Sequence, residues 1–291
     1  MAFRQTPYIK IFLELAKVKI TGAVAFSTFL GYVIFNGKIN IGLILPTLGI
    51  FLLACAASAL NHYQEFEYDA LMERTKNRPI PSGKISPQGA LLFAVFLTIS
   101  GSTILYWGAG FVGLQLGILA LLWYNAIYTP LKRKTPFAVI PGSFIGAIPP
   151  AVGWVAAGGP VYDIKILMVS FFFFIWQIPH FWLLAMKYGK QYESAGFPSI
   201  STIYTPKSLR NITFVWTITA AIAAMFIPMF GGMNFAWLKI VIIVGSLLLV
   251  AAFSSLLTVR DDSSYNKKYF IYINIYLLFI IFVLSVDAIA Y

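Results

Sequence analysis

Long uncharged stretches, separated by short charged segments, occupy most of this sequence. With histidine counted as neutral, they cover 20–37, 39–64, 85–131, 135–162, 166–186, 211–238, 240–259 and 269–286. A helix needs about 20 residues to cross the hydrocarbon of a bilayer, so 85–131 is long enough for two crossings, divided near Gly108-Ala109-Gly110. The pattern predicts nine membrane-spanning helices in a single domain, 1–291. Continuous apolar runs do not match the alternation of an outer-membrane β-barrel.

The composition agrees with an all-α integral membrane protein. Hydrophobic residues make up 59% of the chain and charged residues only 11%, whereas an ordinary soluble domain carries about 25% charged residues. These values exclude a soluble enzyme, a disordered chain and a nucleic-acid-binding domain as the main interpretation. The single cysteine, Cys55, excludes an internal disulfide framework and a cysteine-based metal site.

Positive charges are distributed unevenly between the two sides of the predicted bundle. Of the 21 Lys and Arg residues, 18 fall on the side of the N-terminus, and only Lys38, Lys165 and Lys239 fall on the other side. Because cytoplasmic segments carry the excess of Lys and Arg, the N-terminus is predicted in the cytoplasm and the C-terminus outside. The two longest connections, 61–88 and 187–210, then face the cytoplasm. Long connections are commonly functional, so we predict that these two are active-site loops.

The first of these connections begins with the most polar run in the chain, NHYQEFEYDALMERTKNRP. If the preceding helix continues to about residue 73, Asn61, Glu65 and Asp69 stand at i, i+4 and i+8 on one helix face. Two carboxylates and an amide oxygen are hard donors suited to Mg²⁺, which takes phosphate oxygens as further ligands. Arg74 and Arg78 follow, and arginine binds phosphate oxygens with a planar fork. The pattern therefore favours a site for a lipid diphosphate with Mg²⁺.

The alternative interpretation of this run is a solvated loop whose charges pair with one another and set the topology. We assign Glu67, Glu73, Lys76 and Lys84 to that category. Glu67 lies off the shared helix face, so it serves as an internal control for the carboxylates on that face.

A second polar constellation, FFFFIWQIPHFWLLAMKYGKQYES, lies in the span that precedes the second long connection. His180 stands in the cytoplasmic half of this span beside Gln177, and an ionisable residue inside a span is a functional candidate. The alternative is a structural histidine bonded to a backbone carbonyl that Pro179 leaves free. Lys187 and Gln191 share the helix face of His180, so Lys187 could reach a phosphate or a carboxylate.

A third polar segment, YNAIYTPLKRKTP, runs from Tyr124 to Pro136. Within this segment, Lys132 is the residue that we expect to bind the diphosphate, from a different side than the residues of the first run. The alternative assigns the three cations of this segment to topology and Tyr128 to the membrane interface. The next span contains PGSFIGAIPPAVGW, whose Gly, Pro and Ala permit close helix packing and a bend near a cavity.

These motifs resemble the UbiA superfamily of intramembrane prenyltransferases and, within it, the heme O synthase family. The first run is similar to the family pattern N-x3-D-x3-D-x2-M-x-R-T-x2-R-P, and the second to W-Q-x-P-H-F. Two positions differ from the family. Glu65 stands where an Asp is usual, and Gln191 stands where an acidic residue usually precedes Tyr192. The segment 124–136 also looks like the family, and the resemblance covers roughly 10–285.

The resemblance implies a UbiA-type bundle in the cell inner membrane that transfers the farnesyl group of farnesyl diphosphate to a vinyl group of heme b with Mg²⁺. It implies catalytic roles for Glu65, Asp69 and His180, and metal binding by Asn61, Glu65 and Asp69. It implies diphosphate binding by Arg74, Arg78, Lys132 and Lys187, and an acceptor side formed by Tyr128, Gln177, His180, Gln191 and Tyr192. Heme A synthase or a terminal oxidase assembly is the implied protein partner, and no nucleic acid is expected.

Three other functions share parts of this pattern. A related prenyltransferase that acts on a quinone precursor or another aromatic acceptor uses the same donor chemistry, and Gln191 leaves it open. A transporter would explain nine spans with a polar residue inside one, but it is expected to carry charges in several spans or broken helices in paired positions. A non-catalytic heme- or lipid-binding assembly factor would need no metal site.

Overall fold

The computed structural model describes residues 8–258 and 263–291. Two of the 18 cations assigned to the N-terminal side, Arg4 and Arg260, lie outside these ranges. The described ranges contain helices and no β-strand. The α-helices are α1 (Tyr8–Ala16), α2 (Val18–Asn36), α3 (Ile44–Leu71), α4 (Pro87–Leu122), α5 (Thr129–Leu131), α6 (Val139–Ala156), α7 (Ile164–Ser194), α8 (Pro206–Phe230), α9 (Ala236–Ser254) and α10 (Ser263–Ile289). Short 3-10 or π segments are η1 (Ile41–Leu43), η2 (Trp123–Tyr128), η3 (Pro136–Ala138), η4 (Ile200–Thr202) and η5 (Ser255–Leu257).

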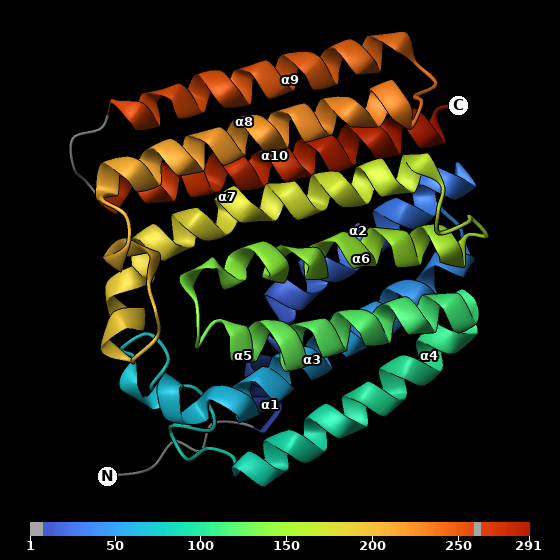
Figure 1. Cartoon of the computed structure of the whole chain (residues 1–291). Coiled ribbons are helices and arrows are strands. Elements are labelled where there is room, and N and C mark those ends of the chain that lie inside the picture. Colours follow the sequence, from blue (N-terminus) through green and yellow to red (C-terminus); the bar gives the residue numbers. More distant parts are fainter. Residues whose placement is uncertain (1–7, 259–262) are drawn as a thin grey trace.

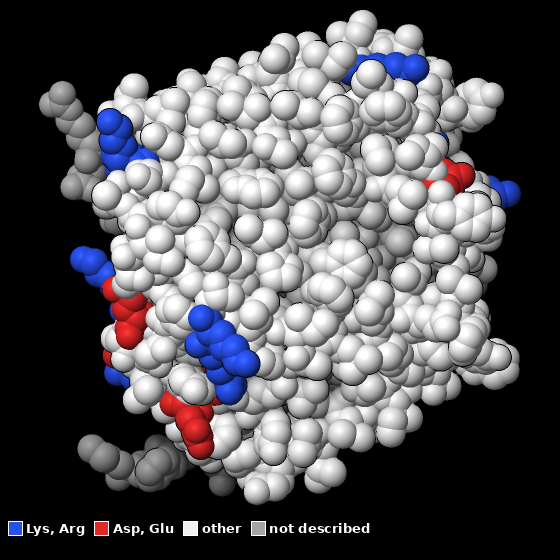
Figure 2. Space-filling model, in the orientation of Figure 1, with Lys and Arg blue, Asp and Glu red and all other residues white. Residues whose placement is uncertain are grey.

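Eight helical stretches among the described residues are long and apolar enough to cross a membrane. Figure 1 shows them side by side as one bundle, with α7 and α10 near its middle. In the same orientation, Figure 2 shows charged side chains gathered at the two ends of the bundle, most of them at one end, with a wide uncharged belt between. An apolar belt between polar ends is the surface that a bilayer requires of a helical protein.

The helices pack in an order that joins the two halves of the chain. Helix α3 contacts α2 and α4, and α6 contacts α2, α4 and α7. Helix α8 contacts α7 and α9, and α10 returns to contact α7, α2 and α9. This closure brings the C-terminal helix against the N-terminal half.

Helix α4 reverses its direction at Gly110, which has a left-handed backbone with φ 66° and ψ −169°. A Cβ added to Gly117 would lie 2.4 Å from Cδ2 of Leu105. A straight helix, rising about 1.5 Å per residue, would place these residues roughly 18 Å apart. Figure 1 shows the chain turning back at this point. The predicted division of the 85–131 stretch therefore falls at Gly110, where glycine tolerates the required φ.

Two helices extend further than their uncharged stretches. Helix α3 continues to Leu71 and α7 to Ser194, so the predicted loops 61–88 and 187–210 both begin as helix. The correction has a physical reason, since charged residues mark where the hydrocarbon ends, whereas a helix can continue into the polar interface. The predicted continuation of the first helix to about residue 73 was closer to the structure. The parts of the two predicted loops that lie outside α-helix are the shorter connections 72–86 and 195–205, the second of which contains η4.

Helices α2 and α6 approach each other closely at two glycines. A Cβ on Gly31 would lie 1.8 Å from the carbonyl oxygen of Pro150, and a Cβ on Gly153 would lie 1.8 Å from that of Thr28. Small residues allow such backbone contacts between membrane helices. The Gly- and Pro-rich composition of α6 therefore serves close packing against α2, as the sequence suggested.

Candidate active site

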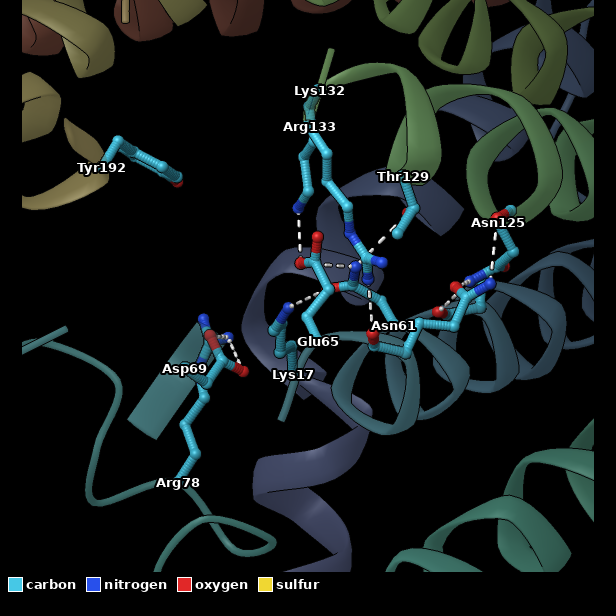
Figure 3. Close-up of polar contacts among 12 residues, drawn as sticks. Lys17, Asn61, Glu65, Asp69, Arg78, Asn125, Thr129, Lys132, Arg133 and Tyr192 are labelled. Atoms are coloured by element: carbon cyan, nitrogen blue, oxygen red, sulfur yellow. Dashed lines mark hydrogen bonds and ion pairs between the residues drawn. The ribbon is translucent and has the colours of Figure 1, made fainter. Parts of the chain in front are cut away.

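Asn61, Glu65 and Asp69 lie on one side of α3, close to its end, and we call them the α3 cluster. All three side chains are buried. Nδ2 of Asn61 donates a hydrogen bond to Oε2 of Glu65 at 2.9 Å, as the helical spacing of four residues allows. Figure 3 shows the three residues in succession along the helix. Two buried carboxylates at the end of a membrane helix require compensating charge.

Arg78 and Lys132 supply that charge from two other segments. Nη1 of Arg78 lies 2.7 Å and 2.6 Å from the two carboxylate oxygens of Asp69. Nζ of Lys132 lies 2.5 Å from Oε2 of Glu65. Figure 3 shows the two cations approaching the α3 cluster from different elements. Each carboxylate thus has its own basic partner, and both partners were predicted to bind diphosphate.

Lys17 adds a third cation from the junction of α1 and α2. Its Nζ donates a hydrogen bond to Oδ1 of Asn61 at 3.5 Å, and its backbone is left-handed with φ 47°, which is uncommon for a residue other than glycine. Removal from water, followed by the charges of Arg78 and Lys132, lowers the pKa of Lys17 from 10.5 to about 7, while the carboxylates of the α3 cluster oppose this effect. An anion bound beside Nζ would favour the charged form, so this position suits a phosphate.

Glu65 retains one oxygen that fits a metal ligand. Its two hydrogen-bond donors both contact Oε2, whereas Oε1 is buried with no hydrogen-bond partner among the described residues. An unpaired buried carboxylate oxygen is costly, and coordination would satisfy it. No group of three or more His, Cys, Asp or Glu that could hold a metal occurs in the described part of the chain. Mg²⁺ is commonly held by only one or two carboxylates with water and phosphate oxygens, so Oε1 of Glu65 is a suitable donor for it. Both carboxylate oxygens of Asp69 accept from Arg78.

The π-helix η2 fixes the position of the segment that follows it. One π turn adds a residue and rotates the chain beyond it relative to a regular helix. Within η2 the buried Asn125 forms a reciprocal amide pair with Gln64 of α3. Its Nδ2 donates to Oε1 of Gln64 at 3.0 Å, and Nε2 of Gln64 donates to the backbone carbonyl oxygen of Asn125 at 3.0 Å. Beyond η2, Oγ1 of Thr129 accepts from Asn61 at 3.3 Å. The pair thus locks the register in which Thr129 and Lys132 meet the α3 cluster.

Arg133 strengthens the same attachment. It donates a hydrogen bond to the backbone carbonyl of Gln64, and its guanidinium carbon lies 4.7 Å from the ring centroid of Tyr68. Both contacts are to α3. Arg133 therefore holds α3 against the segment after α5, which goes beyond the topological role that its charge alone suggests.

A pocket to which several aromatic side chains contribute lies between α7, the segment after η2 and the segment 197–200. We call it the aromatic pocket, and its lining includes Arg74, Tyr128, Lys132, Phe181, Trp182 and Tyr192. Nη2 of Arg74 donates to the hydroxyl of Tyr192 at 3.4 Å, and its guanidinium carbon lies 4.9 Å from the ring centroid of Tyr188. Figure 3 shows Tyr192 apart from the α3 cluster, on another element. The pocket joins residues predicted for the diphosphate to residues predicted for the acceptor.

A second, more apolar pocket lies between α2, α3, α4 and α6. We call it the apolar pocket, and its lining includes Lys17, Ile50, Leu53, Gly117, Tyr124 and Pro149. Tyr124 lines this pocket and Tyr128 lines the aromatic pocket, with their ring centroids 5.7 Å apart. The two pockets therefore lie on either side of one tyrosine pair.

Four predicted site residues lie outside this arrangement. The ring of His180 packs 4.7 Å from that of Phe270 on α10, with Asn274 as a polar neighbour, and its Nδ1 is buried without a hydrogen-bond partner. His180 is absent from the lining of the aromatic pocket, whereas Phe181 and Trp182 contribute to it. The amide of Gln177 packs on Gly146 of α6. The remaining two are Gln191 and Lys187. Oε1 of Gln191 is buried and has no hydrogen-bond partner within 8–258 and 263–291, and Lys187 is exposed with its Nζ 4.9 Å from the ring centroid of Tyr188.

Sequence reasoning missed three contributors to the site. Lys17 carries a charge that the sequence shows, but its contact with Asn61 depends on how α1 and α2 join. Asn125 and Thr129 are uncharged, and only the helix packing of η2 on α3 reveals their contacts. The segment 124–136 was singled out as family-like, which was the available signal for the last two.

The fold and the site together define a membrane-embedded helical bundle with a buried site of carboxylates and cations at one end. The model of the UbiA prenyltransferase family matches residues 24–281. The chain belongs to the UbiA prenyltransferase family, and it is a multi-pass enzyme of the plasma membrane.

Individual relatives agree with this assignment. A protoheme IX farnesyltransferase of Oleidesulfovibrio alaskensis is 30% identical over 94% of this chain and 95% of its own length; relatives of the same name occur in Nitratidesulfovibrio vulgaris and Geobacter sulfurreducens. Among solved structures, a digeranylgeranylglyceryl phosphate synthase superposes with a TM-score of 0.79 at 19% identity, covering 98% of this chain and 100% of its own. A UbiA homolog from Archaeoglobus fulgidus bound to GPP and Mg²⁺ has a TM-score of 0.67 at 12% identity, covering 94% of this chain and 99% of its own. These structural likenesses concern the fold.

Proposed function

We propose that this enzyme transfers the farnesyl group of farnesyl diphosphate to a vinyl group of heme b and so makes heme O. The relatives named protoheme IX farnesyltransferase support the substrates. The observation that carries the chemistry is the α3 cluster, in which Glu65 keeps a buried oxygen without a described partner. Lys17, Arg78 and Lys132 each contact one member of this cluster. This combination of oxygen donors and cations suits a metal-bound diphosphate.

The α3 cluster would hold Mg²⁺, which neutralises charge that develops on the leaving diphosphate. Lys17, Arg78 and Lys132 bind the diphosphate oxygens and stabilise the same charge. The C1–O bond of the donor breaks with release of diphosphate, and the terminal vinyl carbon of the acceptor bonds to C1. Water then adds its oxygen to the neighbouring carbon as the hydroxyl, and the proton that it loses goes to the released diphosphate. The apolar pocket receives the farnesyl chain, beginning at Lys17, and keeps water from the reacting carbon.

The remaining predicted residues complete this proposal at the acceptor side. Tyr128 and Tyr192 would contact the acceptor from the aromatic pocket. His180, together with Gln177 and Gln191, would position the α7 segment that carries Phe181 and Trp182. Lys187 is exposed at the end of the same helix, where it would attract the anionic donor.

We further propose nine membrane crossings with a cytoplasmic N-terminus and an external C-terminus. The cation distribution supports this orientation, and the reversal at Gly110 supports two crossings within α4. The connections 72–86 and 195–205, with the helix ends that precede them, would then form the cytoplasmic entrance to the site. The product would pass from this membrane enzyme to heme A synthase or to a terminal oxidase assembly.

A related prenyltransferase with a quinone precursor or another aromatic acceptor is the second candidate. Gln191 favours it, because the heme O synthase pattern usually has an acidic residue at that position. A transporter is less well supported, since the ion pairs among the described residues lie in or beside the α3 cluster and the adjoining connection. Both candidate prenyltransferases use the same donor site, so the experiment must identify the acceptor.

Heme analysis separates these candidates. Membranes with and without the protein are extracted, and the heme is examined for the mass of one farnesyl group plus one water. The proposal expects this species only in membranes that contain the active enzyme. Its absence, together with a prenylated quinone precursor in the same membranes, would establish the second candidate instead.

A further inference from the structure

The two pockets reach the α3 cluster through different lysines. Lys17 lines the apolar pocket and donates to Asn61 at 3.5 Å. Lys132 lines the aromatic pocket and lies 2.5 Å from Glu65. The α3 cluster therefore has a lysine from each pocket in contact with it, and the tyrosine pair Tyr124 and Tyr128 lies between the two pockets. A donor whose tail fills one pocket would present its reacting carbon to an acceptor in the other.

We propose that the aromatic pocket binds the porphyrin acceptor, with its reacting vinyl edge beside Tyr128 and Lys132 and its propionates at Arg74. This inference rests on the proposed function. It assigns the acceptor to a particular set of side chains on α7 and the segment after η2, apart from the pocket for the prenyl tail.

The chemistry of the lining fits a large, flat aromatic ligand. Phe181, Trp182, Tyr188 and Tyr192 supply ring faces and edges to the pocket, and aromatic rings stack favourably on one another. Trp182 is only 2% exposed, and its Nε1 is buried without a hydrogen-bond partner among the described residues. A buried indole N–H usually has a partner, so a bound ligand that offers an acceptor or a π face would satisfy it.

The charge at the pocket fits the carboxylates of such a ligand. Arg74 is exposed and forms no ion pair with a described carboxylate. Its contacts are the hydroxyl of Tyr192 and the ring of Tyr188. These partners leave its charge uncompensated, and arginine binds carboxylates with a planar fork. Arg74 is thus available for a propionate, in place of the diphosphate role that the sequence pattern implied for it, whereas Lys132 is directed to Glu65.

The test measures the binding of each substrate separately, with the full chain purified in detergent. Protoheme binding is followed by its Soret absorbance, and donor binding by a non-hydrolysable farnesyl thiodiphosphate with Mg²⁺. Ala185→Trp fills the aromatic pocket, and the matched variant Ala54→Trp fills the apolar pocket. We expect Ala185→Trp to raise the Kd for protoheme at least about tenfold and to leave that for the donor analogue within about twofold, with the reverse for Ala54→Trp.

A second variant tests the charge without altering the packing. Arg74→Gln should raise the Kd for protoheme about tenfold. It should leave binding of protoheme dimethyl ester unchanged, because the ester has no free propionates. Since Arg74 is exposed, this variant remains informative if the pocket-filling variant fails to fold.

Several results would overturn the inference. Wild-type affinity for protoheme in Ala185→Trp, or loss of protoheme binding in Ala54→Trp alone, would place the porphyrin elsewhere. If Arg74→Gln raised the Kd for protoheme and the Kd for its dimethyl ester equally, Arg74 would not contact the propionates. Displacement of bound protoheme by phosphatidylglycerol vesicles and not by phosphatidylcholine vesicles would assign the pocket to an anionic lipid. A wrong proposed function would give a different result. In that case the wild-type protein itself would bind no protoheme, or would bind it without forming heme O.

Discussion

Nζ of Lys132 lies 2.5 Å from Oε2 of Glu65, although 67 residues separate them in the chain. The exposed fractions of the two side chains are 18% and 5%, respectively. This pair joins α3 to the segment after α5, and it does so beside the unpaired Oε1 of Glu65. Loss of one partner of a buried ion pair leaves the other charge uncompensated, so the pair links the position of the metal site to that of the diphosphate-binding lysine.

Shortening the acidic partner should weaken both functions of this pair. Glu65→Asp withdraws the carboxylate from Lys132 by one methylene, and we expect kcat/KM to fall about tenfold with a higher Mg²⁺ requirement. Glu65→Gln removes the charge, and we expect a loss of about a thousandfold. Steady-state assays of heme O formation at several Mg²⁺ concentrations measure both. Wild-type activity of Glu65→Gln would show that this carboxylate binds no metal.

Asp69 should be more sensitive than its exposed neighbour in α3. Asp69→Asn removes a candidate Mg²⁺ ligand and leaves Arg78 without its partner, so heme O formation should be abolished. Glu67→Gln is the matched control, because Glu67 is exposed and off the shared face; it should retain activity within about twofold. Chelation with EDTA should stop the wild-type reaction, and Mg²⁺ should restore it. Wild-type farnesylation by Asp69→Asn with Mg²⁺ would show that the metal role is wrong.

Asn125 should act through Lys132. Asn125→Ala removes the hydrogen bonds that Nδ2 donates to Oε1 of Gln64 and to the backbone carbonyl of Ala57, and we expect the KM for farnesyl diphosphate to rise about tenfold in otherwise wild-type protein. In a Lys132→Met background the same change should have little further effect, because the side chain that Asn125 positions is gone. Ile127→Ala, on the exposed side of the same π-helix, is the control. Additive effects of Asn125→Ala and Lys132→Met would indicate independent roles.

The contact between α2 and α6 should tolerate no side chain at Gly153. Gly153→Ala places a methyl group against the carbonyl oxygen of Thr28, and such overpacking costs about 1–3 kcal/mol. Gly22→Ala is the control in α2, since no atom lies within 4 Å of its added Cβ. Thermal unfolding in detergent should show a lower midpoint for Gly153→Ala only. Equal midpoints would mean that the two helices can separate without cost.

The sequence predicted those features that depend on local periodicity. The face shared by Asn61 and Glu65 follows from the helical repeat, and the break near Gly110 follows from the length of one uncharged stretch. The contacts of Lys17 and Asn125 could not be predicted, because they depend on how separate helices pack. The orientation of His180 depends on which neighbour covers its face of α7, and the sequence did not identify α10. A π turn such as η2 leaves no sequence signal that could have located the register of Lys132.

Membrane insertion of the stretch 85–131 requires no ionised side chain to cross the bilayer, because the turn at Gly110 is as uncharged as the two helices it joins. With the two crossings proposed for this stretch, it would enter the bilayer as a helical hairpin. Its two halves already pack on each other through Leu105 and Gly117. A paired hairpin would reach the lipid before α6 to α10 are synthesised, and it would give α3 a partner during that interval.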